Sequence, residues 1–174
     1  MNFRIPFGVR GHKYTEEEIA TTVAVMHGEA PLTQGIHLRE FEESFRLYAD
    51  VEHAFAVSSA TAALEIAAQL CQFETDDEVI VPAHTYTSSA YPFVKAGATP
   101  VWADIDPDTR VVTAETISAC ISSRTRAVVV PHLYGYGVDM TPIMALAEER
   151  QIIVIEDAAQ AVGVRIDSRM AGTL

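Results

Sequence analysis

The feature that most constrains the fold is an alternation, from residue 51 onward, of short apolar runs with segments of helical spacing. Continuous apolar strands that alternate with helices are typical of a parallel sheet covered by helices on both faces. The sequence therefore predicts a single α/β layer structure, mainly parallel, over residues 51–174. The expected strands are Ala54–Val57, Val79–Val81, Thr99–Ala103, Ala127–Val130 and Ile152–Ile155, and the expected helices are Thr61–Cys71, Ser88–Ala96, Ala114–Ile121 and Pro142–Arg150.

Residues 1–50 are predicted to form a helical N-terminal segment. Thr15 and Glu18 have the spacing of a capping box, which marks the start of a helix. Apolar residues then recur at helical spacing from Leu38 to Tyr48, with charged residues between them. Later in the chain, Thr141 followed by Pro142 is the expected N-cap and first turn of another helix.

Composition excludes several classes of function. The net charge of −12 argues against a nucleic-acid or anionic-membrane partner, because both carry negative charge. No apolar run approaches the roughly 20 residues of a membrane span, and no secretory signal is visible, so a cytoplasmic protein is expected. Cys71 and Cys120 lack metal-ligand spacing and are predicted to be free thiols.

Polar and aromatic residues follow four of the predicted strands. Ser59–Thr61 come after the first strand, Tyr86 after the second, His132 after the fourth, and Asp157 and Gln160 after the last. The carboxyl ends of parallel strands share one edge of the sheet, where α/β proteins bind their ligands. The sequence therefore predicts a binding site at this edge.

Two of these segments suit charged ligand groups, although each also has a structural interpretation. Ser59-Ala60-Thr61 opens a helix, whose free N–H groups and the Thr61 hydroxyl could bind a phosphate, or Ser59 could simply cap the helix. Asp157 could bind a metal, act as a base, pair with a cationic ring nitrogen or cap the next segment. Without a glycine-rich phosphate loop or a second ligand at metal spacing, neither a nucleotide hydrolase nor a metal site is expected.

Tyr86 and His132 are also open to two interpretations. Tyr86 could stack on a planar ligand or belong to the core. His132 could be an acid–base group, but a buried, hydrogen-bonded histidine is favoured. Taken together, the strand ends suggest a ligand with a phosphate, a flat ring and a ring cation, and pyridoxal phosphate has all three.

The chain resembles the N-terminal half of the sugar aminotransferases of the DegT/DnrJ/EryC1/StrS family, over nearly its whole length. The motifs that carry the resemblance are Pro31-Leu-Thr-Gln-Gly35, Ser58-Ser-Ala-Thr-Ala-Ala-Leu64, Asp77-Glu-Val-Ile-Val-Pro82, Gly97-Ala-Thr-Pro-Val101, Asp104-Ile-Asp106, His132-Leu-Tyr-Gly135, Asp139-Met140 and Ile155-Glu-Asp-Ala-Ala-Gln-Ala161. So many ordered motifs at family spacing make the resemblance highly specific.

The resemblance implies a homodimeric, fold-type I pyridoxal-phosphate enzyme that moves an amino group from glutamate or glutamine to a ketosugar, usually nucleotide-linked, or to a cyclitol. It implies that residues 1–174 are the N-terminal part of the cofactor-binding large domain. Thr61 and the amides of Ala60–Ala62 would bind the cofactor phosphate, and Tyr86 would stack on the pyridine ring. Asp157 would pair with the ring nitrogen, and Gln160 would contact the ring hydroxyl. Ser59 and His132 are further candidates.

The sequence departs from the family pattern at two points. Ala60 stands where the family often has glycine, and alanine is tolerated there only if its φ is negative. The family's Schiff-base lysine has no counterpart, because Lys13 and Lys95 are the only lysines and neither matches its position. We therefore expect the 174 residues to be an inactive fragment of an aminotransferase. The alternatives are a same-family sugar dehydratase with histidine in place of the lysine, or a non-catalytic remnant that binds cofactor or a partner.

Overall fold

The computed structural model describes residues 13–29, 31 and 33–174, which form two compact units divided within one helix, after Ser44. In the first unit, α1 (Glu16–His27) begins with the predicted capping box of Thr15 and Glu18. The second helix, α2 (Ile36–Ala49), crosses the division between the units. Helices therefore account for the regular structure of the described residues before Ala49, as predicted, whereas residues 1–12 lie outside the described part.

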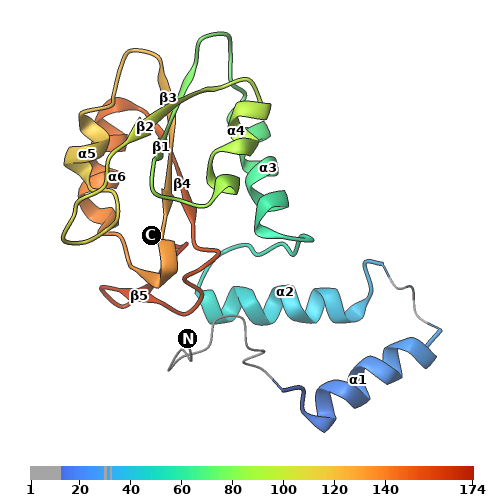
Figure 1. Ribbon diagram of the computed structural model, residues 1–174. Coiled ribbons are helices and arrows are strands. Elements are labelled where there is room, and N and C mark those ends of the chain that lie inside the picture. The colour runs from blue at the N-terminus through green and yellow to red at the C-terminus, as the bar shows by residue number, and fades with distance from the viewer. Residues whose placement is uncertain (1–12, 30, 32) are drawn as a thin grey trace, which may run out of the picture. The chain divides into compact units, whose positions relative to one another are not determined.

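The second unit is built on a parallel sheet with the strand order β2-β1-β3-β4 (Figure 1). The strands are β1 (Glu78–Pro82), β2 (Thr99–Ala103), β3 (Thr125–Pro131) and β4 (Ile153–Asp157). Every residue of β1 is buried, as are the last five of β3, because both strands lie inside the sheet. The predicted fold class, a mainly parallel sheet with helices, is confirmed.

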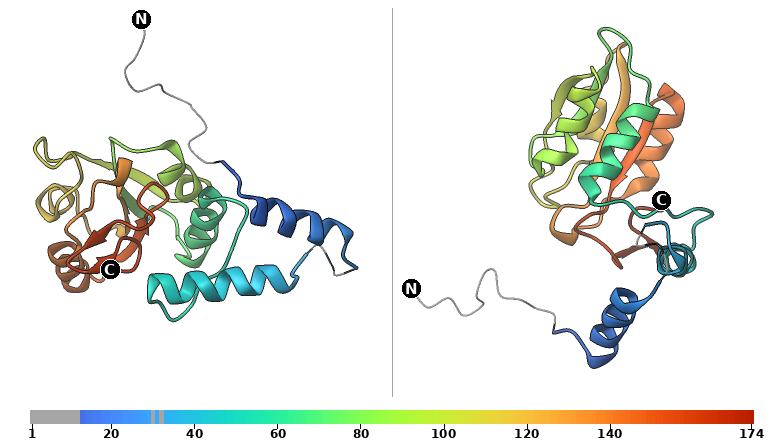
Figure 2. Two further views of the ribbon diagram at one scale, coloured as in Figure 1. Left: turned by 90° about the horizontal axis from the view of Figure 1, so that it is seen from below. Right: turned by 90° about the vertical axis from the view of Figure 1, so that its right-hand side faces the viewer.

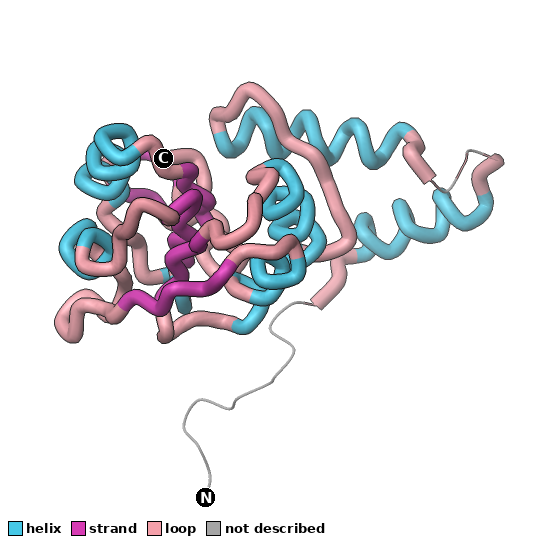
Figure 3. The backbone as a smooth tube through the Cα atoms, turned by 90° about the horizontal axis from the view of Figure 1, so that it is seen from above, coloured by secondary structure: helices cyan, strands magenta, loops and turns pink. Residues whose placement is uncertain are grey.

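Helices cover both faces of this sheet, so that strands lie between helices in the view of Figure 3. On one face α3 (Ala60–Leu70) packs beside α4 (Tyr91–Lys95), and Figure 2 shows the two together. On the other face lie α5 (Ala114–Ser118) and α6 (Met140–Arg150). Alternate side chains of β1 and β3 enter two separate cores: Ile80 and Val128 pack towards α5 and α6, and Val79 and Ala127 towards α3 and α4.

Short elements complete the second unit. They are the 3₁₀ turns η1 (Thr87–Ser89) and η2 (Leu133–Gly135), and a hairpin of β5 (Arg165–Ile166) and β6 (Arg169–Met170). Both cysteines are free, as predicted, and burial raises the pKa of each thiol. Among the described residues, no helix combines the length and apolar character needed to cross a membrane.

Four local predictions were wrong. Residues 54–57 form no strand: the segment belongs to neither sheet of the described chain and is a loop that leads to α3. The helix expected over 88–96 is broken into η1 and α4, since Pro92, in the first turn of α4, has no N–H to donate to the preceding turn. The helix expected over 114–121 ends at Ser118, so its last predicted turn is not α-helical. Asp139, and not Thr141, caps α6, with its Oδ1 accepting a 3.1 Å hydrogen bond from Thr141 N.

Candidate functional site

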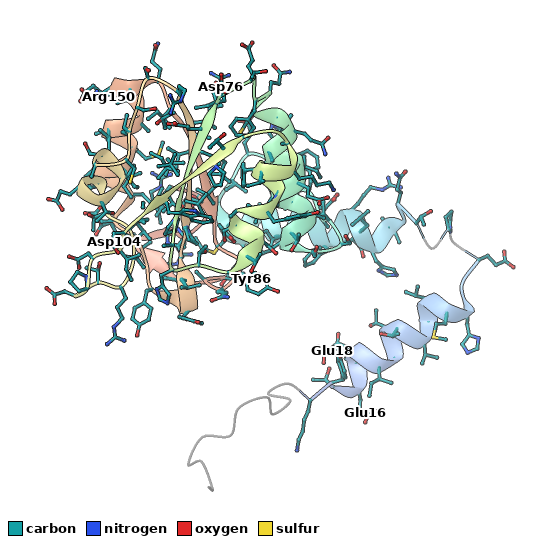
Figure 4. The ribbon with its side chains drawn as sticks, turned by 45° about the horizontal axis from the view of Figure 1, so that its top comes forward. Glu16, Glu18, Asp76, Tyr86, Asp104 and Arg150 are labelled. Atoms are coloured by element: carbon teal, nitrogen blue, oxygen red, sulfur yellow. The ribbon has the colours of Figure 1, made fainter. Side chains whose placement is uncertain are left out.

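The carboxyl ends of β1, β3 and β4 and the first turn of α3 surround one cavity of about 190 Å³. In Figure 4, Tyr86 and Asp104, which follow β1 and β2, lie at this end of the sheet, and Asp76 and Arg150 lie at the opposite end. Parallel pairing brings the strand ends together, as the sequence predicts. Six predicted site residues line the cavity: Ala60, Thr61, Tyr86, His132, Asp157 and Gln160.

The first turn of α3 provides polar groups on one side of the cavity. Ser59 caps the helix, with its Oγ accepting a 3.2 Å hydrogen bond from Ala62 N, and neither of these two residues lines the cavity. The backbone N–H groups of Ala60 and Thr61 lie in the first turn of α3. Backbone N–H groups in the first turn of a helix have no acceptor within the helix itself. Ala60 is in helical conformation and has no positive φ, so alanine replaces glycine here without strain.

Thr61 points its hydroxyl across the cavity wall to the loop after β1. Its Oγ1 donates a 2.9 Å hydrogen bond to Ser88 Oγ, which ties α3 to η1. Two amides at a helix N-terminus are suited to a phosphate group, because both are donors and the helix dipole favours negative charge. The Thr61 hydroxyl can add a third donor if Ser88 Oγ then donates to Thr61 Oγ1, because each hydroxyl can both donate and accept.

Asp157 is the last residue of β4, because the strand extends two residues beyond its predicted end at Ile155. Its Oδ2 accepts a 2.7 Å hydrogen bond from Ser89 Oγ, and its Oδ1 accepts a 3.2 Å bond from Ala159 N. Ser89 Oγ in turn accepts a 3.0 Å hydrogen bond from Thr85 Oγ1. Both carboxylate oxygens are therefore held in place, and each keeps a lone pair for a cationic group in the cavity.

His132 is the buried, hydrogen-bonded histidine that the sequence favours. Its side chain is completely buried, Nδ1 accepts a 3.1 Å hydrogen bond from Val138 N, and Nε2 lies 2.9 Å from Glu156 Oε1. Since Nδ1 accepts, Nε2 carries the proton and donates to Glu156. Its ring therefore forms part of the cavity wall while both of its nitrogens are occupied inside the protein.

Glu156 has three hydrogen-bond donors around its carboxylate. Besides His132, the amide of Gly172 donates to Oε1 at 3.0 Å and that of Leu174 to Oε2 at 2.8 Å. Burial raises the pKa of Glu156, but these hydrogen bonds outweigh burial and hold the pKa below its usual value. This carboxylate therefore fastens residues 172–174 to the end of β4, behind the cavity.

Gln160 presents hydrogen-bond donors to the cavity. Its Oε1 accepts a 2.8 Å hydrogen bond from Tyr134 N, which fixes the orientation of the amide. Among the described residues nothing accepts a hydrogen bond from its Nε2, so two N–H donors remain for a ligand oxygen. Tyr86 completes the cavity with an aromatic side chain that is 64% exposed, which favours the predicted ligand contact over a place in the core.

Thr85, Ser88 and Ser89 also line the cavity, and reasoning from the sequence missed them. All three are donors or acceptors in the hydrogen bonds that hold Thr61 and Asp157. The only signal in the sequence is the cluster of small hydroxyl residues after the strand end, in Thr85-Tyr-Thr-Ser-Ser89. Among the described residues no group of His, Cys, Asp and Glu side chains could hold a metal ion.

The whole set of groups fits pyridoxal phosphate. The cavity has donors suited to a phosphate, a carboxylate suited to a cationic ring nitrogen, and an amide N–H₂ suited to a ring hydroxyl. An aromatic ring supplies the stacking surface. Among the residues that the structure describes, no lysine or arginine lines the cavity.

A family model described as the DegT/DnrJ/EryC1/StrS aminotransferase family matches residues 12–174. GDP-perosamine synthase from Caulobacter vibrioides is 42% identical over 140 residues, which are 80% of this chain and 38% of that protein. L-glutamine:2-deoxy-scyllo-inosose aminotransferase from Streptomyces kanamyceticus is 39% identical over 135 residues, 78% of this chain and 32% of that protein. The chain thus spans less than two fifths of the length of these two relatives.

The fold matches solved structures of the same kind. The PLP form of the putative sugar aminotransferase Spr1654 from Streptococcus pneumoniae superposes with a TM-score of 0.81 and 30% identity. The match covers 87% of this chain and 42% of that one. The described fold therefore corresponds to part of a PLP-dependent aminotransferase domain.

Proposed function

The chain belongs to the DegT/DnrJ/EryC1/StrS aminotransferase family, and we propose that the protein is a pyridoxal-phosphate-dependent sugar aminotransferase. Its reaction moves an amino group from glutamate or glutamine to a nucleotide-linked ketosugar or a cyclitol. The observation that carries the proposal is the single cavity in which Thr61, Tyr86, Asp157 and Gln160 meet. Residues 1–174 would be the N-terminal part of the large, cofactor-binding domain of this enzyme.

Each side chain has a role that follows from its contacts. Thr61 and the free amides of α3 would bind the phosphate, and Tyr86 would stack on the ring and exclude water from one face. Asp157 would hold a proton at the pyridine nitrogen, and Gln160 would donate to the ring hydroxyl. The cofactor, when bound, supplies an electron-accepting ring for amino transfer, and this requires the protonated nitrogen.

The family also suggests how the protein is organised. We expect a cytoplasmic homodimer with the site near the subunit interface. The proposed role in the biosynthesis of sugars or polysaccharides is supported by relatives such as the spore coat polysaccharide biosynthesis protein SpsC. Light scattering of the purified protein tests the dimer, which would be excluded by a monomeric mass.

The decisive variant for the proposed function is Asp157→Asn. It keeps the size of the side chain and a hydrogen-bond acceptor for Ser89, but it removes the negative charge. In the full-length enzyme, of which residues 1–174 are proposed to be the N-terminal part, we expect the variant to retain most of its bound pyridoxal phosphate. Its aminotransfer rate should fall at least about 100-fold, the loss that about 2.7 kcal/mol of barrier height produces. Occupancy is measured by absorbance of the released cofactor, and the rate by formation of the amino sugar.

Asp76→Asn is the matched control. Asp76 is exposed, lies at the opposite end of the sheet (Figure 4) and has a positive φ that asparagine tolerates well. An unchanged rate in Asp157→Asn would exclude the proposed role. A dehydrated sugar in place of an amino sugar as the wild-type product would exclude aminotransfer itself.

A further inference from the structure

A chain of two hydroxyl groups ends on the carboxylate of Asp157. Thr85 Oγ1 donates a 3.0 Å hydrogen bond to Ser89 Oγ, which donates a 2.7 Å bond to Asp157 Oδ2. We propose that Ser89, supported by Thr85, is a positioning residue for amino transfer: acting through Asp157, it keeps the shared proton on the ring nitrogen of the cofactor. The inference rests on the proposed function, in which Asp157 pairs with that nitrogen.

The carboxylate fixes the direction of both hydrogen bonds. An ionised carboxylate can only accept, so the single hydroxyl proton of Ser89 goes to Asp157. The Ser89 oxygen can then only accept from Thr85, whose own hydroxyl proton points to Ser89. Donation by Thr85 polarises the Ser89 hydroxyl and thereby strengthens its hydrogen bond to the carboxylate.

The fold after β1 brings the two hydroxyls together. Ser89 N donates a 2.9 Å hydrogen bond to the carbonyl oxygen of Tyr86, which closes η1 and places position 89 close to position 85. The Ser89 side chain is completely buried and that of Thr85 is half-buried, and both residues line the cofactor cavity. Because Ser89 is shielded from solvent, water does not compete for its hydrogen bond to Asp157.

The hydrogen-bond partners of Asp157 are neutral groups. Besides the Ser89 hydroxyl, the backbone amide of Ala159 donates to Oδ1 at 3.2 Å. Within the described part of the chain no lysine, arginine or histidine forms an ion pair with Asp157. A cationic partner would also stabilise the carboxylate, but it would repel a protonated ring nitrogen. Neutral donors stabilise the carboxylate and leave its charge for the ring.

These contacts determine where the shared proton is most stable. When donors stabilise the ionised carboxylate, the proton is favoured on the ring nitrogen, where amino transfer requires it. Without the Ser89 donor, Asp157 would hold the proton more tightly, and its carboxylate would also lose a contact that fixes its orientation. Both effects favour a neutral ring nitrogen, so they predict a change in the same direction.

The adjacent serine provides an internal comparison. Ser88 lies in the same 3₁₀ turn and also lines the cavity, but its Oγ accepts a 2.9 Å hydrogen bond from Thr61 Oγ1. Consecutive serines of η1 are thus bonded to two different parts of the proposed cofactor site, Ser88 to the phosphate-binding residue and Ser89 to the partner of the ring nitrogen. Loosening of the whole turn would affect both parts, whereas loss of the Ser89 donor affects the nitrogen.

The test uses the full-length enzyme, of which residues 1–174 are proposed to be the N-terminal part, loaded with pyridoxal phosphate that carries ¹⁵N in its ring. The nitrogen chemical shift is recorded by NMR. We expect Ser89→Ala to move the shift from that of a protonated pyridinium towards that of a neutral pyridine. Thr85→Val should move it in the same direction by a smaller amount. Ser88→Ala is the matched control and should keep the wild-type shift.

Rate and affinity measurements separate the two serines further. Ser89→Ala should lower kcat and kcat/KM for amino transfer equally, by roughly 10-fold, because the interaction matters only when the ring accepts electrons. Ser88→Ala should instead weaken the binding of pyridoxal phosphate by up to about 10-fold, the effect of losing one hydrogen bond at the phosphate end.

A wild-type nitrogen shift in both Ser89→Ala and Thr85→Val would overturn the inference, and so would an equal change of shift in Ser89→Ala and Ser88→Ala. If Ser89→Ala binds no cofactor, the shift of Thr85→Val decides alone. A neutral nitrogen in Asp157→Asn alongside these negative results would leave the proposed function standing. A neutral nitrogen in the wild type, or no uptake of pyridoxal phosphate, would overturn the proposed function and the inference together.

Discussion

Ser89 Oγ donates a 2.7 Å hydrogen bond to Oδ2 of Asp157, although the two residues are 68 positions apart in the chain. Ser89 is completely buried in η1, and Asp157 ends β4. The bond joins the loop after one strand of the sheet to the end of another. It fixes the carboxylate that is proposed to face the cofactor nitrogen.

Replacing Ser89 by alanine is expected to lower the free energy of unfolding by about 1.5–3 kcal/mol, because a buried hydrogen bond to a carboxylate is lost. Chemical denaturation measures this change. Ser123→Ala, an exposed serine in a loop, is the control and should stay within about 0.5 kcal/mol of wild type. Equal stability of the two variants would show that the Ser89 bond contributes nothing.

Thr61→Val removes the hydroxyl but keeps the shape of the side chain. If Thr61 binds the cofactor phosphate, its affinity for pyridoxal phosphate should fall by roughly 10-fold or more, as expected for one hydrogen bond to a charged group. Thr61→Ser, which restores the donor, should recover most of the affinity. Equilibrium dialysis supplies both values, and a valine variant that binds as tightly as the serine variant would contradict the role.

Tyr86→Phe and Tyr86→Ala separate the ring from the hydroxyl. Stacking on the cofactor requires only the ring, so the phenylalanine variant should bind pyridoxal phosphate like wild type. The alanine variant should lose about 0.5–1.5 kcal/mol of binding free energy. A loss of the same size in both variants would assign the contact to the hydroxyl, and stacking would be rejected.

The lowered pKa of Glu156 predicts that the stability of the protein depends on pH. Its pKa is lowered in the folded protein, so its contribution is complete above the pKa of an unfolded glutamate, near 4.5, and is lost as the pH falls through the lower folded value. Glu156→Gln should therefore be less stable than wild type at pH 7, and the difference should shrink as the pH falls below 4.5. Denaturation at a series of pH values measures it, and a difference that is constant with pH would refute the role of the charge.

The fold could be predicted wherever the local pattern sets the structure. The apolar residues of β1 and β3 identify buried parallel strands, and the small residues of α3 identify a helix against a sheet. The segment 54–57 has the same local pattern, but its structure depends on a pairing partner elsewhere in the chain, which no local pattern encodes.

The site divides in the same way. Topology alone places Tyr86, His132 and Asp157 together, because parallel strands end at one edge. Ser88 and Ser89 could not be predicted, because their partners Thr61 and Asp157 are 27 and 68 positions away. Side-chain hydrogen bonds at such separations depend on how the loops close over the sheet.

The central claim, that Asp157 keeps the cofactor nitrogen protonated, can be measured directly. Pyridoxal phosphate labelled with ¹⁵N in the ring is bound to the wild-type protein and to Asp157→Asn, and the nitrogen chemical shift is recorded by NMR. The account predicts the shift of a protonated pyridinium in wild type and that of a neutral pyridine in the variant. A neutral nitrogen in the wild type, or the same shift in both proteins, would contradict it.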